Sequence, residues 1–270
     1  MDHLHRELAP ISDKGWGLIE TDATRTLRHF LAARPLVDFS GPHGWEHAAA
    51  NLGRVRTVEP GSAGEPAAEV RSAQPLVELR VPMEIPHDVI GDADRGAPDP
   101  DLATVVEAAR RLAEAEDRAV FHGWEAAGIA GITPSSPHEP LSISDNYDDY
   151  PGVVARAVAR LRASGVGGPY AIALGPRCYT GVIETTEHGG YPVLDHIKLI
   201  LGGPIAWAPA VDGAVVLSLR GDDYELVCGQ DTSIGYRRHD DAVVELYLEE
   251  SLTFLVREPR AAIALVYPGE

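Results

Sequence analysis

Few side chains in this sequence are spaced in a way that could do chemistry, and the clearest case is a run of histidine and glutamate. His43-Gly44-Trp45-Glu46-His47 matches H-x-x-E-H, the inverted zincin pattern in which two histidines hold zinc beside a general base. This chemistry needs both imidazoles on one face of a helix. Because Gly41-Pro42 precedes the run and Gly44 lies within it, the sequence favours a loop. A metal-dependent peptidase acting through His43, Glu46 and His47 remains an alternative, beside a simple elbow packed by Trp45.

A second group of polar side chains lies between residues 184 and 196. It combines carboxylates, a histidine, an aromatic ring and two glycines: Glu184, Glu187, His188, Gly189, Gly190, Tyr191 and Asp195. Carboxylates beside a histidine could bind a metal or act as an acid and base pair. They could equally line a pore or form a solvated loop without a function, and the spacing does not separate these possibilities.

No other pattern indicates a catalytic, cofactor or metal site. Cys178 and Cys228 are fifty positions apart and form no C-x-x-C pair, so we expect two buried thiols in a reducing cytosol. The sequence contains no P-loop, no dinucleotide-binding glycine pattern and no G-x-S-x-G nucleophile motif. We therefore expect no catalytic residues, no resident metal and no cofactor.

The composition argues against several classes of partner. The 270 residues carry 41 acidic and 23 basic side chains, a net charge of −18. Such an excess of negative charge disfavours binding to nucleic acid or to anionic membranes. The first residues lack the apolar stretch of a signal peptide, and the longest uncharged apolar run, Leu199 to Val211, is too short to span a bilayer. We expect a soluble cytoplasmic protein.

The first half of the chain should form two long helices and a hairpin between them. Apolar side chains recur every three or four residues from Ser12-Asp13 to Pro35, which predicts a helix, and a short strand at residues 36–39 follows. Residues 50–58 and 68–81 flank a Gly/Pro-rich tip at 59–66, which predicts a two-stranded ribbon. Asp99-Pro100 should open a second helix that ends near His122.

The predicted ribbon has no covering element of its own. A two-stranded hairpin is only marginally stable in water, and its unpaired edges would attract other strands. We therefore expect the ribbon to lie on another copy of the chain, which indicates an assembly subunit.

The second half of the chain should form a compact α/β block and then a set of strands. The block holds a helix at 151–163, a strand at 170–174 and short elements at 176–184, 193–201, 205–207 and 214–219. Strands at 224–228, 233–236 and 243–256 follow. Glu250 interrupts the apolar face of the last strand and could be an edge charge, a bulge or the buried partner of an arginine. This order of elements predicts an α+β fold.

Several motifs, taken together, resemble one protein family. They are Leu8-Ala9-Pro10-Ile11, Gly41-Pro42-His43-Gly44-Trp45-Glu46, Pro75-Leu76-Val77-Glu78-Leu79-Arg80, Glu116-Asp117-Arg118-Ala119-Val120-Phe121, Gly168-Pro169-Tyr170, and the runs at 229–236 and 246–254. In this order and spacing the chain resembles the encapsulins, the shell proteins of bacterial nanocompartments once described as linocin-like bacteriocins. The resemblance covers essentially the whole chain.

The resemblance implies the major-capsid fold of tailed bacteriophages, an α+β fold with three parts. The peripheral domain would take residues 1–43, 85–134 and 223–270, the elongated loop residues 44–84, and the axial domain residues 135–222. The ribbon would then be the elongated loop. About 60 copies would close into the smallest icosahedral shell, because heterologous contacts that close give finite assemblies.

The resemblance also implies two kinds of site. A cargo enzyme, often a dye-decolorising peroxidase or a ferritin-like protein, would dock a C-terminal peptide in a groove that offers pockets and polar clamps. That groove would be lined by Leu27, Phe30, Leu31, Arg34, Val37, Asp38, Asp231, Ile234 and Tyr236. The second site would be a five-fold pore lined by the polar group at 184–196, whose carboxylates would favour cations. Gly189-Gly190 departs from the single glycine that most relatives have there.

Two alternatives stay open beside the compartment shell. A prophage-type capsid subunit would share the fold and enclose a genome, which the acidic composition disfavours. The metal-dependent peptidase described above is the other.

Overall fold

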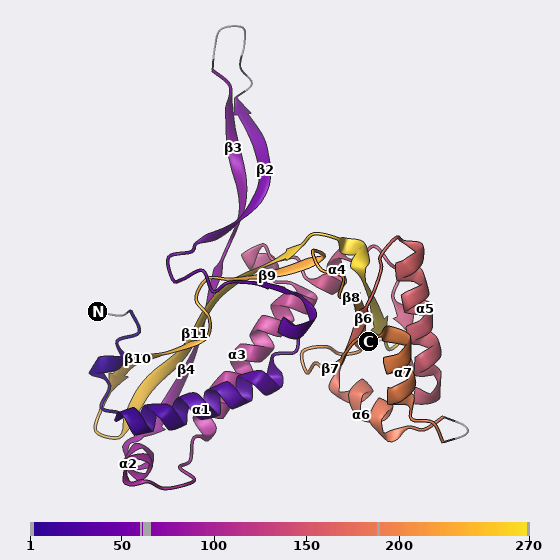
Figure 1. Cartoon of the computed structure of the whole chain (residues 1–270). Coiled ribbons are helices and arrows are strands. Elements are labelled where there is room, and N and C mark those ends of the chain that lie inside the picture. The colour runs from indigo at the N-terminus through magenta and orange to yellow at the C-terminus, as the bar shows by residue number, and fades with distance from the viewer. Residues whose placement is uncertain (1–2, 60, 62–65, 188–189, 269–270) are drawn as a thin grey trace.

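The longest strand of the protein, β11 (Val243–Val256), is the centre of one of two five-stranded sheets. The computed structural model describes residues 3–59, 61, 66–187 and 190–268, and it shows two blocks side by side with a ribbon rising from one of them (Figure 1). In the first sheet, β4 (Val77–Pro86) pairs antiparallel with one edge of β11. Along its other edge lie β10 (Ser233–His239) and then β9 (Tyr224–Cys228), both antiparallel. β1 (Asp38–Ser40) runs parallel to β9.

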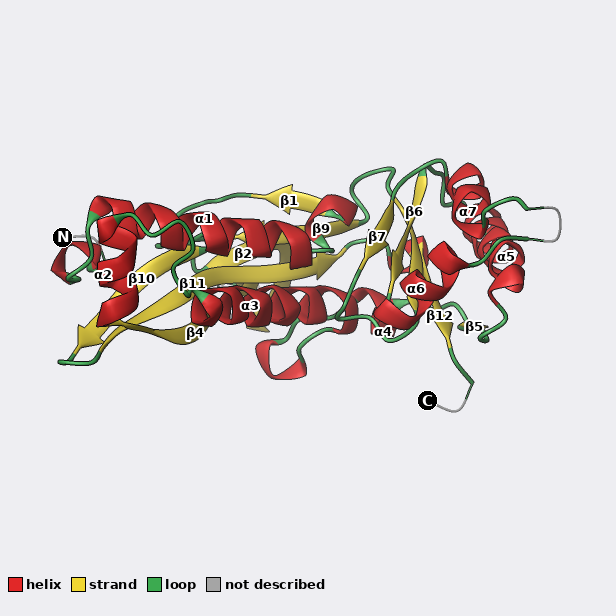
Figure 2. Cartoon of the chain, turned by 90° about the horizontal axis from the view of Figure 1, so that it is seen from below, coloured by secondary structure: helices red, strands yellow, loops and turns green. Residues whose placement is uncertain are grey.

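Two long helices cover one face of this sheet. α1 (Asp13–Phe30) and α3 (Ala103–His122) lie side by side along the strands (Figure 2). α1 begins where the sequence predicts, because the hydroxyl of Ser12 accepts the N–H of Gly15 at 3.1 Å and so caps the helix. Its buried side chains, Trp16, Ile19, Ala23 and Leu27, repeat every three or four positions and form the face that packs on the core.

The second long helix, α3, begins later than the sequence predicts. The Asp99-Pro100 start is wrong: the helix begins at Ala103, whose N–H is accepted by the Asp101 carboxylate. A proline tolerates the first helical position without requiring it, and burial of Leu102 in the core sets the start instead. The predicted end is confirmed, since Gly123 has a φ of +79° and a side chain there would collide with the backbone of Gly131. The sequence did not predict the short helix α2 (His87–Arg95).

The predicted ribbon is present, and nothing else in the described chain covers it. β2 (Ala49–Glu59) and β3 (Ala68–Pro75) form a separate antiparallel pair that projects from the first block (Figure 1). Residues 51–59 and 66–71 are all exposed, including Val55 at 56%. The second arm is shorter than predicted, because residues 77–81 belong to β4 and pair with β11. The predicted tip lies partly outside the described residues, at 60 and 62–65.

The second block contains the other sheet, in the order β5 (Leu141–Ser142), β12 (Ala262–Val266), β8 (Ala214–Ser218), β6 (Tyr170–Leu174) and β7 (Ile205–Trp207). Its helices, α5 (Tyr150–Ala163), α6 (Pro176–Glu184) and α7 (Val193–Leu201), gather at the end far from the N-terminus (Figures 1 and 2). β12 lies in this sheet beside β8, although the domain boundaries expected from the sequence group it with the first block.

Short helical turns join these elements. They are η1 (Arg6–Leu8), η2 (Arg34–Leu36), η3 (Glu125–Ala127), α4 (Ile132–Ser135), η4 (Tyr147–Asp149) and η5 (Pro259–Ala261). The predicted strand at 36–39 is reduced to β1, since Leu36 ends the η2 turn. The strand predicted at 233–236 continues to His239. Within the described residues, no helix has both the length and the apolar character needed to cross a membrane.

Shortening the ribbon should separate folding from assembly. Asn51 and Ala73 face each other in the β2–β3 register, so replacing residues 52–72 with Asn-Gly would close the hairpin there. Because the described side chains of this segment are almost all exposed, we expect the shortened chain to keep its circular dichroism spectrum and cooperative unfolding but to form no closed particles. Size-exclusion chromatography and negative-stain microscopy would measure this, with Val55→Thr as the full-length control. Shortened chains that still form particles of normal size would contradict the expectation.

Candidate functional site

A buried group of charged side chains joins four parts of the first block, and Arg34 is at its centre. The Arg34 guanidinium donates to both carboxylate oxygens of Glu116, with an Nη2–Oε2 distance of 2.7 Å. The same Nη2 donates to Glu250 Oε1 at 2.6 Å, and Nη1 donates to Asp231 Oδ1 at 2.8 Å. These contacts connect η2 after α1, the helix α3, the loop after β9, and β11. Of the three possibilities for Glu250, the buried partner of an arginine is therefore confirmed.

Burial controls the protonation of this cluster. The side chains of Glu116 and Glu250 are 0% and 1% exposed. Burial, with the nearby Glu116 carboxylate, raises the pKa of Glu250 well above its usual range. Burial opposes the charge on Arg34, but its contacts with Glu116, Glu250 and Asp231 raise the pKa of the guanidinium overall. The cluster therefore combines a permanent cation, Arg34, with a buried carboxyl group, Glu250, that binds its proton more tightly than usual.

Asp117 fixes the turn that places Arg34. Its two carboxylate oxygens accept the N–H groups of Ala32 and Ala33 at 2.9 and 3.0 Å, just after α1 ends. Burial raises the pKa of Asp117 to about 7, although the two backbone hydrogen bonds favour the charged form. Sequence reasoning did not assign a role to Glu116 or Asp117. The signal was available, because two adjacent acidic residues stand among the apolar residues of the predicted helix.

The residues predicted to bind a cargo peptide differ in accessibility. Leu27 and Ile234 are 9% and 5% exposed and belong to the main core. Phe30, Leu31, Val37 and Tyr236 are half-buried and pack against that core. Phe30 also contacts Trp207 of the second block, with ring centroids 5.4 Å apart. Arg34 and Asp231 are brought together, as described above.

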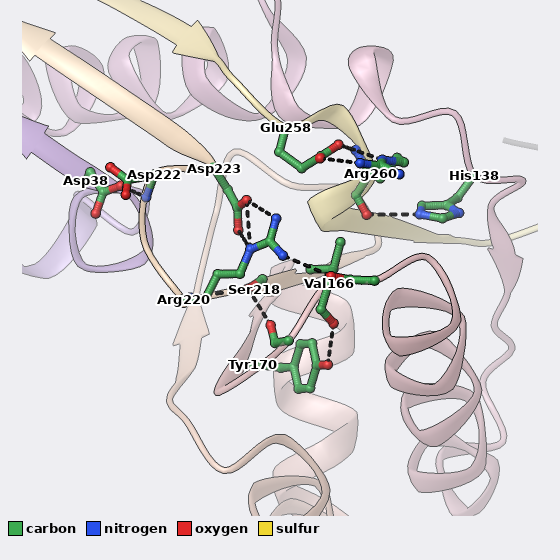
Figure 3. Close-up of polar contacts among 12 residues, drawn as sticks. Asp38, His138, Val166, Tyr170, Ser218, Arg220, Asp222, Asp223, Glu258 and Arg260 are labelled. Carbon is green, nitrogen blue, oxygen red and sulfur yellow. Dashed lines mark hydrogen bonds and ion pairs between the residues drawn. The ribbon is translucent and has the colours of Figure 1, made fainter.

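Asp38 is the most exposed member of the predicted groove and lies where the two blocks meet. Its Oδ2 accepts the N–H of Asp222 at 2.6 Å (Figure 3). Beside it is a cavity of about 160 Å³, whose lining includes Val37, Asp38, Ser218 and Asp223. This cavity extends the predicted groove toward the second block.

An arginine and aspartate pair, which sequence reasoning missed, holds the junction of the blocks. Arg220 donates from Nη2 to Asp223 Oδ1 at 2.7 Å and from Nη1 to the carbonyl of Gly165 at 3.1 Å (Figure 3). The hydroxyl of Ser218 donates to the carbonyl of Gly167 at 2.7 Å. Because Arg220 and Asp223 are only three residues apart around a turn, the sequence looked like an ordinary surface loop.

The segment predicted to line a pore connects α6 and α7. Glu187 Oε1 lies 2.7 Å from His196 Nδ1, and the N–H of Glu187 donates to the carbonyl of Tyr191 at 2.8 Å. Glu184, Tyr191 and Asp195 are exposed. Gly190 has a φ of +82°, a conformation that favours glycine. His188 and Gly189 lie outside the described residues.

The H-x-x-E-H run does not have the geometry of a zincin site. Residues 43–47 form a turn between β1 and β2 and contain no helix. His43 Nε2 contacts the hydroxyl of Ser40 at 2.9 Å, and the rings of His43 and His47 are 4.7 Å apart. The elbow is confirmed. The Trp45 ring stacks on His3, with ring centroids 4.4 Å apart, and the residue stays 50% exposed.

The fold as a whole is that of a capsid-forming shell protein. The virus-like particle protein of Pyrococcus furiosus superposes with a TM-score of 0.65 over 93% of this chain and 99% of its own, at 15% sequence identity. The capsid of Myoviridae phage XM1 gives a TM-score of 0.56 at 10% identity, over 87% of this chain and 92% of its own. The predicted α+β fold of tailed-phage major capsid proteins is therefore confirmed.

Sequence comparison identifies the family. The family described as "Encapsulating protein for peroxidase" matches residues 1–253. The type 1 encapsulin shell proteins of Rhodospirillum rubrum and Rhodococcus erythropolis are 50% and 45% identical to this chain. Each alignment covers 98% of this chain, and they cover 96% and 100% of those proteins. The chain belongs to the encapsulin shell protein family, as the sequence motifs indicated, and its role is structural rather than enzymatic.

Removing the Arg34 cation should destabilise the subunit strongly. In Arg34→Met, the buried carboxylates of Glu116 and Glu250 lose their counter-charge, which costs roughly 3–5 kcal/mol in comparable buried pairs. The urea midpoint, followed by tryptophan fluorescence at a fixed protein concentration, would measure the loss. Arg25→Met is the matched control, because Arg25 is 71% exposed and its pair with Asp22 lies at the surface. Equal midpoints for the two variants would contradict the central role of Arg34.

Asp117 should make the subunit less stable as the pH rises through neutrality. Its folded pKa of about 7 exceeds the unfolded value of roughly 3.9, so the folded state keeps a proton that the unfolded state has lost. This contribution is complete below pH 4 and falls by at most about 1.4 kcal/mol per pH unit up to pH 7.

The Asp117→Asn variant tests this slope. An amide cannot accept both N–H groups, so the variant should be less stable than the parent at every pH. Because the amide does not titrate, the unfolding free energy of the variant should vary less between pH 4.5 and 8 than that of the parent. Asp22→Asn, at the surface, should keep the parent slope. Parallel pH curves for parent and Asp117→Asn would rule out a raised pKa.

Proposed function

We propose that about 60 copies of this encapsulin shell protein close into a cytoplasmic icosahedral shell in which each ribbon lies on a neighbouring copy. The observation that carries the proposal is the ribbon itself: an isolated pair of strands with exposed valines is marginally stable alone and needs a surface to cover it. We assign residues 44–84 to the elongated loop, 135–222 to the axial domain and the rest to the peripheral domain. We assign β12 (Ala262–Val266) to the axial domain as an exception, because it pairs with β8.

The cargo is proposed to dock near the C-terminal end of α1. Phe30, Leu31 and Val37 offer half-buried apolar surface, Tyr236 offers more from the edge strand β10, and the cavity beside Asp38 lies adjacent. An extended peptide can use such pockets for alternate side chains, with Asp38 as a polar clamp. Three predicted residues lie beneath this surface and support it. Leu27 and Ile234 belong to the core, and Arg34 belongs to the charged cluster. A dye-decolorising peroxidase or a ferritin-like protein is the proposed cargo, docked by its C-terminal peptide.

The segment between α6 and α7 is proposed to line the five-fold pore. Its exposed carboxylates, Glu184 and Asp195, would attract cations, and the contact of Glu187 with His196 would brace the loop. His188, Gly189, Gly190 and Tyr191 complete this proposed rim.

A prophage-type capsid subunit is the second candidate, since phage capsids share the fold. The net charge of −18 favours an enzyme cargo over a packaged genome, because DNA binding needs basic surfaces. We therefore propose that the shell encloses no nucleic acid and binds no membrane.

Phe30→Asp should give intact shells that contain no cargo. The substitution places a charge on the half-buried apolar surface where the peptide is proposed to bind. The variant would be co-expressed with a dye-decolorising peroxidase that carries its native C-terminal tail. The measured quantity is the ratio of haem absorbance to the amount of shell protein in sedimented particles. We expect at least a ten-fold fall in haem per subunit.

Two controls make the cargo result interpretable. Thr24→Asp adds the same charge at an exposed position of α1 and should load normally. Removing the tail from the peroxidase should empty the parent shells. Normal haem content in intact Phe30→Asp shells would refute the docking site.

A further inference from the structure

The exposed side of α3 carries a cavity that shares no lining residue with the cavity beside Asp38. It has a volume of about 340 Å³, and its lining combines charged side chains with an apolar surface: Arg111, Glu114, Ala115, Arg118, Ala119, Gly123 and Trp124. Pockets that hold small molecules have volumes of roughly 300–1,000 Å³ and are mostly apolar, with a few polar groups. The α3 cavity therefore has the size and the composition of a small-ligand site.

The helical repeat brings the lining side chains of α3 to one side of the helix. Arg111, Ala115 and Arg118 are spaced by four and then three positions, so they follow one another along a single face. Because a helix rises 1.5 Å per residue, the two arginines are about 10 Å apart along its axis. Ala115 lies between them, and its methyl side chain leaves room for a ligand.

Arg118 is the free cation of this cavity. It is exposed, and within the part of the chain that the structure describes no group accepts a hydrogen bond from its guanidinium. Arg111 is held in place, because its Nη2 donates to the Pro82 carbonyl at 3.2 Å. The Glu114 carboxylate accepts a hydrogen bond from Arg110. With two arginines and one glutamate, the lining has a net charge of +1 in a chain whose net charge is −18.

Trp124 forms an aromatic wall of the cavity. Its N–H donates to the Ile129 carbonyl at 2.8 Å, and the Ile129 N–H donates to the Trp124 carbonyl at 3.0 Å. These two hydrogen bonds fix the backbone where the chain leaves α3 at Gly123. Trp124 nevertheless remains 37% exposed, so its indole ring offers a flat apolar surface to a ligand. Tryptophan and arginine are enriched among the residues that contribute most to binding at protein interfaces.

We propose that this cavity binds a small aromatic carboxylate. The carboxylate would accept two hydrogen bonds from the planar guanidinium of Arg118, and the ring would stack on Trp124 above Ala115 and Ala119. Arg111 would add attraction from the other end of the cavity. A monoanion suits the lining better than a phosphate dianion, because the lining has a single positive charge in excess.

Isothermal titration calorimetry of the purified, assembled protein tests the site with three probes. 2-Naphthoate combines a flat ring with a carboxylate, 2-naphthylmethanol has the ring without the charge, and acetate has the charge without the ring. We expect about one 2-naphthoate to bind per subunit, since each subunit has one such cavity. 2-Naphthylmethanol should bind roughly ten-fold more weakly or worse, because it lacks the charge-assisted hydrogen bonds, and acetate should give no measurable heat.

Substitutions separate the contributions of charge and ring. Arg118→Met should weaken 2-naphthoate binding by roughly ten-fold or more and leave 2-naphthylmethanol binding unchanged. Arg118→Lys should recover part of the lost affinity, since it keeps the charge without the planar guanidinium. Trp124→Leu should weaken the binding of both ring compounds. Arg28→Met is the matched control, because Arg28 is also an exposed arginine on a long helix, and it should bind like the parent.

Three calorimetric results would overturn the proposal: no 2-naphthoate binding by the parent, equal affinities for 2-naphthoate and 2-naphthylmethanol, or the same affinity in Arg118→Met and Arg28→Met. Loss of particles in Arg118→Met, with a folded subunit, would overturn it too, since another copy of the chain would then occupy the cavity. Because no cargo enzyme is present in these titrations, the outcome leaves the proposed cargo groove unaffected.

Discussion

The contact on which the first block depends is the guanidinium of Arg34 held by carboxylates from three other places in the chain. The guanidinium donates hydrogen bonds to Glu116 on α3, Glu250 on β11 and Asp231 after β9. Replacing such a cluster with apolar residues can be neutral, but breaking it leaves unpaired buried charge. The cluster therefore fixes how helix and sheet meet more than it adds net stability. The end of α1 follows from it, because Asp117, beside Glu116, ties down the two residues before Arg34.

This rigid interior contrasts with the ribbon. The core continues through both blocks, from Trp16 to Tyr267. Within the part of the chain that the structure describes, β2 and β3 form a sheet only with each other. A chain built in this way can fold as a subunit and still leave a pair of strands with no covering surface. That division suits a shell protein, since the fold is completed inside the subunit and, in the proposed shell, a neighbouring copy would cover the exposed valines.

The two blocks meet at a polar junction that surrounds the end of β1. Arg220 and Asp223 brace the turn between β8 and β9, and Asp38 receives the neighbouring N–H of Asp222 (Figure 3). The aromatic contact of Phe30 with Trp207 crosses the same boundary. The proposed cargo groove and the charged cluster thus share one region, where α1, β1 and the loop after β9 come together. A change in the protonation of Glu250 would act on the residues that support the proposed groove.

The sequence by itself determined the α1 stripe, the existence of the ribbon, the end of α3 at Gly123, the α+β order and the family. These features depend on local periodicity, on turn residues and on motifs that are read along the chain. The sequence could not place the start of α3, which depends on the packing of Leu102 in the core. It also could not show that the chain passes from the ribbon into the first sheet at Leu76, because this depends on pairing with a strand about 170 residues later. The sequence also left three roles open for Glu250, because its partner Arg34 is distant along the chain. Only the tertiary structure decided that Arg34, Glu116, Asp231 and Glu250 meet, because charge pairing between residues up to 216 positions apart leaves no periodic trace in the sequence.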